Sequence, residues 1–140
     1  MNALRGFLLL LAAGAALLAP TAAQARSAPI ATFENIAISA AEGRKLTLDQ
    51  VKRAIVQAAA TRQWAPSVQN ANTVRATYTK GKHSAVVDVA FTETSYSIHY
   101  VDSTNLGYAD QGGKAVIHPA YNKAVTALRQ GIEAALRTIN

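Results

Sequence analysis

The sequence predicts an α+β fold of two layers, in which two helices pack on one face of an antiparallel meander of three to four strands. Apolar residues recur at helical spacing in one segment between residues 48 and 62 and in another at the C-terminal end. Between them, three consecutive segments alternate between apolar and polar residues, as strands with one buried face do. Packing both helices on that face buries the apolar side of every element in one core.

Residues 1–25 have the pattern of a cleavable secretory signal peptide. Arg5 supplies a positive start, the apolar run GFLLLLAAGAALLA follows, and Pro20 and an A-x-A motif that ends at Ala25 mark the cleavage site. The run is shorter than the ~20 residues that span a bilayer, so a membrane anchor or a buried helix fits less well. We therefore expect a flexible lead-in over residues 26–32 and a single domain over residues 33–140.

The chain after the signal is basic and has no cysteine. The 14 Lys and Arg residues include Arg5, which leaves 13 against 8 acidic residues, a net charge of +5. The basic residues are scattered except at Lys80-Gly81-Lys82, so they allow only weak binding to an anionic surface. The lack of cysteine excludes a disulfide, a thiol nucleophile and a lipidated N-terminal cysteine. We expect a bacterial protein that is periplasmic or secreted, with no transmembrane segment in its mature chain.

The first predicted helix runs from Leu48 to Arg62. Thr47, followed three residues later by Gln50, is the capping-box pattern of a helix start. Pro66 disfavours continuation of the helix, and we expect Trp64 to fold back onto the core.

The second predicted helix begins at Pro119, because the first helical position needs no N–H donor. Gly131 lies inside it and allows another element to pack closely. The apolar stripe of this helix consists of Tyr121, Val125, Leu128, Ile132, Ala135 and Leu136.

Three strands are predicted from alternation and from β-branched or aromatic content, at Thr73–Thr79, Ser84–Phe91 and Ser95–Val101. Phe33–Ser39 alternates weakly, and whether it joins the sheet stays open. Two-residue turns, one at Gly81-Lys82 and one between the second and third strands, set the register of both hairpins. This register pairs Val74 with Val89, Ala76 with Val87, Tyr78 with Ala85, Val89 with Ile98, Val87 with Tyr100, and Phe91 with Tyr96.

The same register places a row of charged residues on the other face of the sheet. Arg75 lies opposite Asp88, and Asp88 lies opposite His99. Opposite charges across strands stabilise a sheet by about 0.2–1 kcal/mol, and a neighbouring aspartate would favour the charged imidazolium. The row is interpreted either as surface stabilisation of the sheet or as a recognition or acid–base site.

The connection after the third strand supplies three more candidate residues, Ser103, Asn105 and Tyr108. Asp, Ser and Asn favour turns, so the run DSTN can also simply end the strand. The connection from Ser103 to about Ile117 is long and contains three glycines, and loops of about 12–15 residues without structure are often functional or mobile. The candidate binding surface consists of Arg75, Asp88, His99, Ser103, Asn105 and Tyr108.

No set of residues in the sequence matches a known catalytic or metal site. His99 and Ser103, four residues apart on one strand face, would lie about 13 Å from each other, whereas a catalytic hydrogen bond needs about 3 Å. His83, His99 and His118 lack the close spacing of metal ligands, and no Gly-rich phosphate loop follows a strand. We assign no catalytic, cofactor-binding or metal residues. A small hydrolase or metal-dependent enzyme that uses His99, Asp88 and Ser103 stays an alternative.

Four segments carry a resemblance: RQW at Arg62–Trp64, HSAVVDVAF, TSYSIHYVDSTNLGY and IHPAYNKAVTAL. In combination they resemble a set of small exported proteobacterial proteins of uncharacterised function, many of them predicted lipoproteins. The resemblance implies a location in the cell envelope and a similar fold, and it supplies no reaction. This chain departs from the lipoprotein members because no cysteine follows its signal segment.

These features favour a binding or accessory module of the cell envelope that needs no cofactor. It would hold a protein segment or an envelope component on the open sheet face and on the loop after the third strand. The second alternative to this role, besides the enzyme, is a binder of anionic lipid or nucleic acid that uses Lys80 and Lys82.

Overall fold

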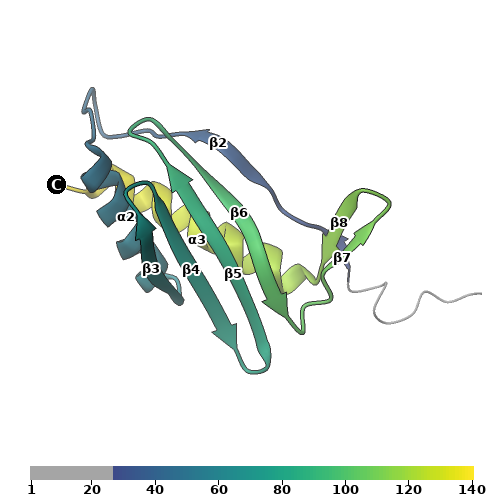
Figure 1. The fold of residues 1–140 in the computed structure, drawn as a ribbon. Coiled ribbons are helices and arrows are strands. Elements are labelled where there is room, and N and C mark those ends of the chain that lie inside the picture. Colours follow the sequence, from purple (N-terminus) through teal and green to yellow (C-terminus); the bar gives the residue numbers. More distant parts are fainter. Residues whose placement is uncertain (1–26) are drawn as a thin grey trace, which may run out of the picture.

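The computed structural model describes residues 27–140, so the predicted signal segment, residues 1–25, and its cleavage site at Ala25 lie outside the described residues. The described chain forms two layers: helices α2 (Leu48–Thr61) and α3 (Pro119–Thr138) cover one face of a five-stranded antiparallel sheet (Figure 1). The strands of this sheet follow the order β2-β6-β5-β4-β3. The predicted α+β fold with both helices on one sheet face is confirmed, with more strands than expected.

The central strands have the predicted register. Every predicted pair is present, from Val74 opposite Val89 to Phe91 opposite Tyr96. Gly81 has the left-handed φ of 59° that suits a two-residue hairpin turn. The strands of the large sheet are β2 (Phe33–Ala37), β3 (Trp64–Asn70), β4 (Thr73–Lys80), β5 (His83–Phe91) and β6 (Ser95–Thr104).

Neither edge strand of the large sheet was predicted from the sequence. Whether the first one joins the sheet was left open, and the other one was missed. Strand β2 pairs with β6, which settles that the segment from Phe33 joins the sheet. Trp64 is buried as expected, but it also begins strand β3. Pro66 is compatible with β3 because an edge strand has one side without a neighbouring strand, where a missing N–H is tolerated.

The long connection after β6 contains a hairpin instead of an unstructured loop. Its turn, Gly112-Gly113, has φ values of 63° and 83°, which only glycine adopts without strain. The hairpin belongs to a second, three-stranded sheet of order β1-β8-β7. Its strands are β1 (Ala28–Pro29), β7 (Ala109–Gln111) and β8 (Lys114–Ile117).

The segment before β2 is attached to the fold. Within the predicted lead-in, the Ile30 N–H donates to the Ala115 carbonyl oxygen at 3.0 Å. The side chain of Asn122 on α3 accepts from the Ala31 N–H at 2.8 Å and donates to the Pro29 carbonyl at 2.9 Å. Strand β1 and the start of α3 therefore hold this segment in place.

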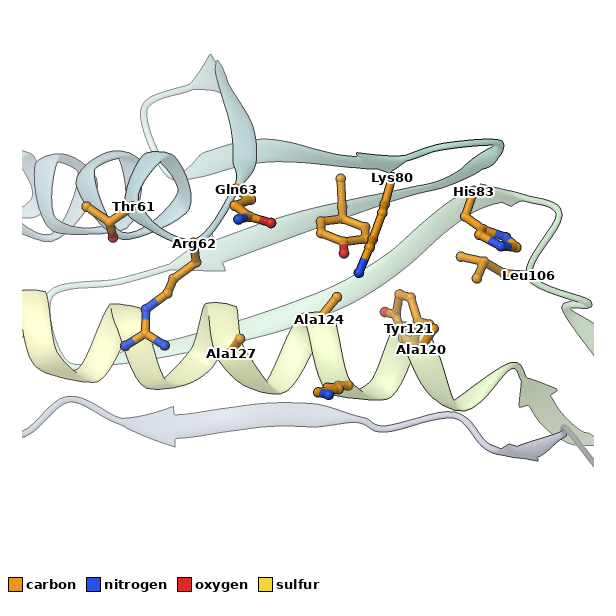
Figure 2. A pocket seen from close by; sticks show the side chains of 12 residues that line it. Thr61, Arg62, Gln63, Lys80, His83, Leu106, Ala120, Tyr121, Ala124 and Ala127 are labelled. Atoms are coloured by element: carbon orange, nitrogen blue, oxygen red, sulfur yellow. The ribbon is translucent and has the colours of Figure 1, made fainter.

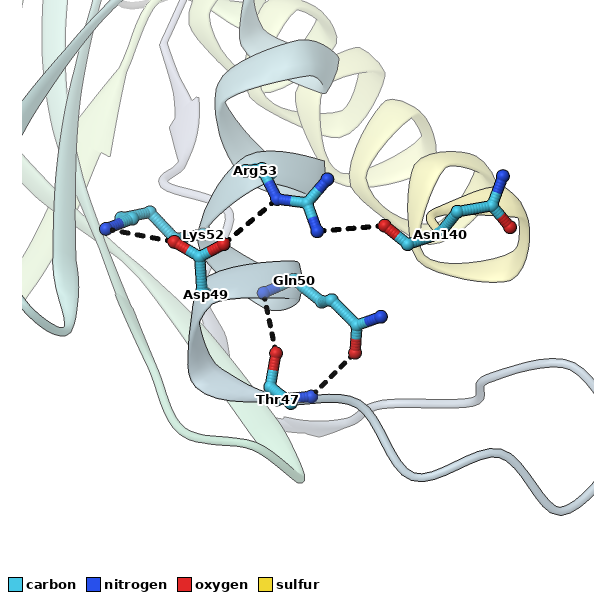
Figure 3. Close-up of polar contacts among 6 residues, drawn as sticks. All are labelled: Thr47, Asp49, Gln50, Lys52, Arg53 and Asn140. Atoms are coloured by element: carbon cyan, nitrogen blue, oxygen red, sulfur yellow. Dashed lines mark hydrogen bonds and ion pairs between the residues drawn. The ribbon is translucent and has the colours of Figure 1, made fainter.

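Helix α2 begins with the predicted capping box (Figure 3). Thr47 Oγ1 accepts from the Gln50 N–H at 3.1 Å, and Gln50 Oε1 accepts from the Thr47 N–H at 2.9 Å. Arg53 Nε donates to Asp49 at 3.0 Å, and its Nη2 donates to the carbonyl oxygen of Asn140 at 2.8 Å. These contacts fix the start of α2 and connect it to the C-terminal end of the chain.

Gly131 allows close packing between the helices, as its position in the sequence suggested. A Cβ atom at this position would lie 2.8 Å from Cγ of Arg62 and 3.5 Å from Cβ of Ala58. Arg62 is the C-cap residue of α2 and lies across α3 at Gly131. The following residue, Gln63, has a left-handed φ of 67° and turns the chain into β3.

Candidate ligand-binding site

The open face of the sheet carries the predicted ion pair between neighbouring strands. Arg75 on β4 and Asp88 on β5 make two parallel hydrogen bonds, with Nε–Oδ1 and Nη2–Oδ2 distances of 2.9 and 3.0 Å. The hydrogen bond to Asp88, and then the negative charge of Asp88, raise the pKa of Arg75. Both charges are thus partnered within the sheet.

His99 lies opposite Asp88 as predicted, but its side chain has a different partner. Its Nε2 lies 3.0 Å from Oε1 of Glu34, which comes from the neighbouring edge strand β2. The expected row of base, acid and imidazole is therefore two separate pairs, Arg75–Asp88 and His99–Glu34. This arrangement is typical of surface stabilisation, since each charged group of the row already has a partner.

A β-bulge in β6 moves Ser103 away from the open face. Val101 is the extra residue, because the pairing of β6 with β5 shifts by one position there. Ser103 then lies opposite the buried Ala85 on the helix side of the sheet, and its Oγ lies 2.7 Å from the Tyr100 hydroxyl. His99 and Ser103 were expected on one face, and the structure places them on opposite faces.

The other two candidate residues hold the segment after β6 against the fold. Asn105 has a left-handed φ of 58°, its Nδ2 donates to the Lys82 carbonyl at 2.8 Å, and its own carbonyl lies 2.7 Å from Nδ1 of His83. Tyr108 is 44% exposed and stacks on Tyr100, with ring centroids 4.3 Å apart. The six candidate residues therefore divide between the open face and the end of β6, and they do not form one continuous surface.

A pocket of about 350 Å³ opens on the helix side, where the end of α2, the β4–β5 hairpin and the first half of α3 meet (Figure 2). This volume lies within the range of about 300–1,000 Å³ that small-molecule sites occupy. Its wall is apolar and aromatic, formed by Tyr78, Leu106, Ala120, Tyr121, Ala124 and Ala127.

Small side chains on α3 create the hollow. Ala120, Ala124 and Ala127 share one face of α3 at spacings of four and three, and short side chains at these positions leave space below the hairpin. Tyr121 forms part of the wall, and its burial raises the pKa of its hydroxyl, so this wall residue is neutral at physiological pH.

The only tryptophan of the chain lies directly behind this wall. The ring centroid of Trp64 is 5.3 Å from that of Tyr78, and its Nε1 donates to the Ala124 carbonyl at 3.2 Å. Because Tyr78 and Ala124 both line the pocket, Trp64 is placed to report on what occupies it.

The charged side chains that line the pocket are all positive at neutral pH. They are Arg62, Lys80 and Lys123, and no Asp or Glu of the described residues lines it. Lys80 extends from β4 toward α3 (Figure 2). Within residues 27–140, the side chains of these three residues make no hydrogen bond or ion pair. From the sequence, Lys80 was interpreted only as part of a basic turn, and the pocket was not predicted.

The part of the chain that the structure describes has neither a cluster of metal-binding side chains nor a helix that could span a membrane. It contains no group of three or more His, Asp or Glu residues that could hold a metal ion. None of its helices is both long enough and apolar enough to cross a membrane.

Comparison of the chain with protein-family models, with curated proteins and with solved structures found no match. The resemblance to small exported proteobacterial proteins therefore stays a prediction from the sequence.

Proposed function

We propose that the protein is a small-ligand-binding module of the bacterial cell envelope, exported by its N-terminal segment, and that its ligand occupies the pocket between the β4–β5 hairpin and α3. The observation that carries this proposal is the combination of a volume of about 350 Å³, an apolar wall and a few polar groups at the rim. Ligand sites in proteins commonly have this composition, because the apolar wall supplies affinity and the few polar groups orient the ligand.

The contrast with the open sheet face supports the choice of the pocket. Arg75 and Asp88 pair with each other, and His99 pairs with Glu34, so a ligand on that face would have to compete with existing contacts. Lys80 and Lys123 at the pocket have no such partners among the described residues.

The geometry gives the hydrolase alternative no support. Ser103 lies on the helix side of the sheet and His99 on the open side, so the nucleophile and the base of the suggested set are separated by the sheet itself. A general base has to reach the proton that it removes, directly or through one water molecule.

The proposal is tested with Trp64 fluorescence and a substitution that fills the pocket. We expect at least one member of a panel of small amphiphiles, with neutral, anionic and cationic head groups, to change the fluorescence in a saturable way. Ala127→Leu should abolish this change because the longer side chain occupies the pocket. Gln130→Leu is the matched control, since Gln130 is exposed on the same helix and does not line the pocket.

Thermal unfolding provides the second readout, because a ligand that binds only the folded state raises the melting temperature. The proposal is wrong if no amphiphile gives a saturable change by either method. It is also wrong if the two leucine variants lose binding to the same degree.

A further inference from the structure

The positive charge of the side chains that line the pocket favours some classes of ligand over others. Arg62, Lys80 and Lys123 line it together with His83, and the part of the chain that the structure describes contributes no carboxylate to it. The Nδ1 atom of His83 carries a proton, because the Asn105 carbonyl at 2.7 Å can only accept a hydrogen bond. Among the described residues, the charged side chains that line the pocket are therefore all cationic.

The positive end of a helix adds to this charge. Ala120 and Tyr121 lie in the first turn of α3 and line the pocket, so the N-terminal end of the α3 dipole is at the site. The dipole alone would not identify a ligand, but it has the same sign as the side chains of Lys80 and Lys123, which line the pocket and make no hydrogen bond or ion pair among the described residues.

The apolar wall indicates the rest of the ligand. Ala120, Ala124 and Ala127 extend along about 10 Å of α3, and Tyr78 and Leu106 also line the pocket. An alkyl chain of medium length matches such a surface, because burying its methylene groups against these side chains removes apolar area from water.

We propose that the ligand is a single-chain amphiphile with an anionic head group, such as a medium-chain carboxylate, with its head at Lys80 and Lys123 and its tail on the α3 wall. This inference rests on the proposed function, because it names the class of ligand for the same pocket. Tail burial supplies affinity, and the head group supplies selectivity.

Three probes with the same alkyl chain separate these contributions: decanoate, decanol and decylamine. Decanoate should bind best and decylamine worst. Lys80→Gln and Lys123→Gln should each weaken the binding of decanoate about tenfold and leave that of decanol unchanged. The matched control is Lys82→Gln, which removes the same charge from the same turn at a residue that does not line the pocket.

Two further series of binding measurements test the tail and the head group of the ligand independently. The first varies the length of the alkyl chain, and the second varies the salt concentration. Affinity should rise by up to about fourfold for each added methylene until the pocket is filled. The preference for decanoate over decanol should decrease as the salt concentration rises, because the rim is open to solvent and its charges are screened.

The outcomes distinguish this inference from the proposed function. If decanol binds as tightly as decanoate, and Lys80→Gln changes neither, the anionic class is overturned while the pocket remains a binding site. If no probe binds, both proposals fail.

Vesicles that contain phosphatidylglycerol test whether the source of the amphiphile is a membrane lipid. Vesicle binding that Ala127→Leu abolishes would support a lipid whose chain enters the pocket. Binding of free decanoate without any binding to vesicles would support a free amphiphile. Vesicle binding that Lys80→Gln and Lys82→Gln weaken equally, with no binding of free decanoate, would overturn the inference in favour of adsorption through the hairpin turn.

Discussion

Arg75 and Asp88 face each other across β4 and β5 and form a bidentate ion pair, with Nε–Oδ1 and Nη2–Oδ2 distances of 2.9 and 3.0 Å. Each of these two charged groups thus pairs with a residue on the neighbouring strand of the same sheet. On the opposite side of the molecule, Lys80 and Lys123 line a pocket and have no such partner among the described residues. We therefore expect substitutions on the two faces to have different effects.

Arg75→Ala should change stability and leave ligand binding intact. Arg75 is 41% exposed in its side chain, so solvent screening keeps the coupling between Arg75 and Asp88 small. A double-mutant cycle with Asp88→Asn in urea unfolding measures this coupling. Loss of amphiphile binding in an Arg75→Ala/His99→Ala variant that remains folded would instead place the ligand on the open face.

Gly131→Ala should have an effect that depends on Arg62. Alanine favours a helix over glycine by about 1 kcal/mol, but the added Cβ would lie 2.8 Å from Cγ of Arg62. In an Arg62→Ala background that conflict is absent, so Gly131→Ala should stabilise the protein by about 1 kcal/mol. In the parent chain the gain should be smaller or reversed. Equal effects in both backgrounds, measured by urea unfolding, would show that Arg62 does not restrict position 131.

Alkaline pH should destabilise the fold through its buried tyrosines. Burial, and then the charge of Glu133, raise the pKa of Tyr96 to about 12, compared with about 10 in an unfolded chain. Between these values the unfolded state has already lost the proton that the folded state keeps. The free energy of unfolding should therefore fall as pH rises from about 10 to 12, by up to about 2 kcal/mol for this residue.

Urea unfolding across this pH interval checks the effect, with Tyr96→Phe as the comparison. The variant should lose less stability than the parent chain over the same interval. Some pH dependence should persist in it, because burial also raises the pKa of Tyr121. Identical pH profiles for the two chains would contradict the assignment to Tyr96.

The sequence predicted the elements whose patterns are local. The register of β4, β5 and β6 followed from two short turns, because a slip of one residue would expose the apolar positions of a strand. The start of α2 followed from Thr47 and Gln50, whose side chains bond to the backbone within one turn. The pairing of Arg75 with Asp88 followed from the same register.

The features that the sequence analysis missed depend on distant parts of the chain or lack an alternating pattern. Strand β3 buries Trp64 but exposes Val68, and the residues of β7 are all exposed. The bulge at Val101 has no turn residue to mark it, so the face of Ser103 was predicted wrongly. The Gly112-Gly113 turn was the available signal for the second hairpin.

The pocket was missed for two reasons. Small alanine side chains on α3 form its hollow, and its walls come from segments that are far apart in the sequence. Ala124 and Ala127 do not belong to the apolar stripe that was predicted for this helix, and Lys80 was interpreted only as one member of a basic turn. The alanine spacing on α3 was a usable signal of a hollow face, but it required the position of the β4–β5 hairpin before it could indicate a site.

The most direct test of the account is to map the bound ligand by chemical-shift changes of backbone amides. On addition of decanoate, the largest changes should occur at Leu106, Ala120 and Ala124, which surround the pocket, while the amides of Arg75 and His99 should stay nearly unchanged. Large changes on the open sheet face, with little change around the pocket, would contradict the central claim that the ligand binds between the hairpin and α3.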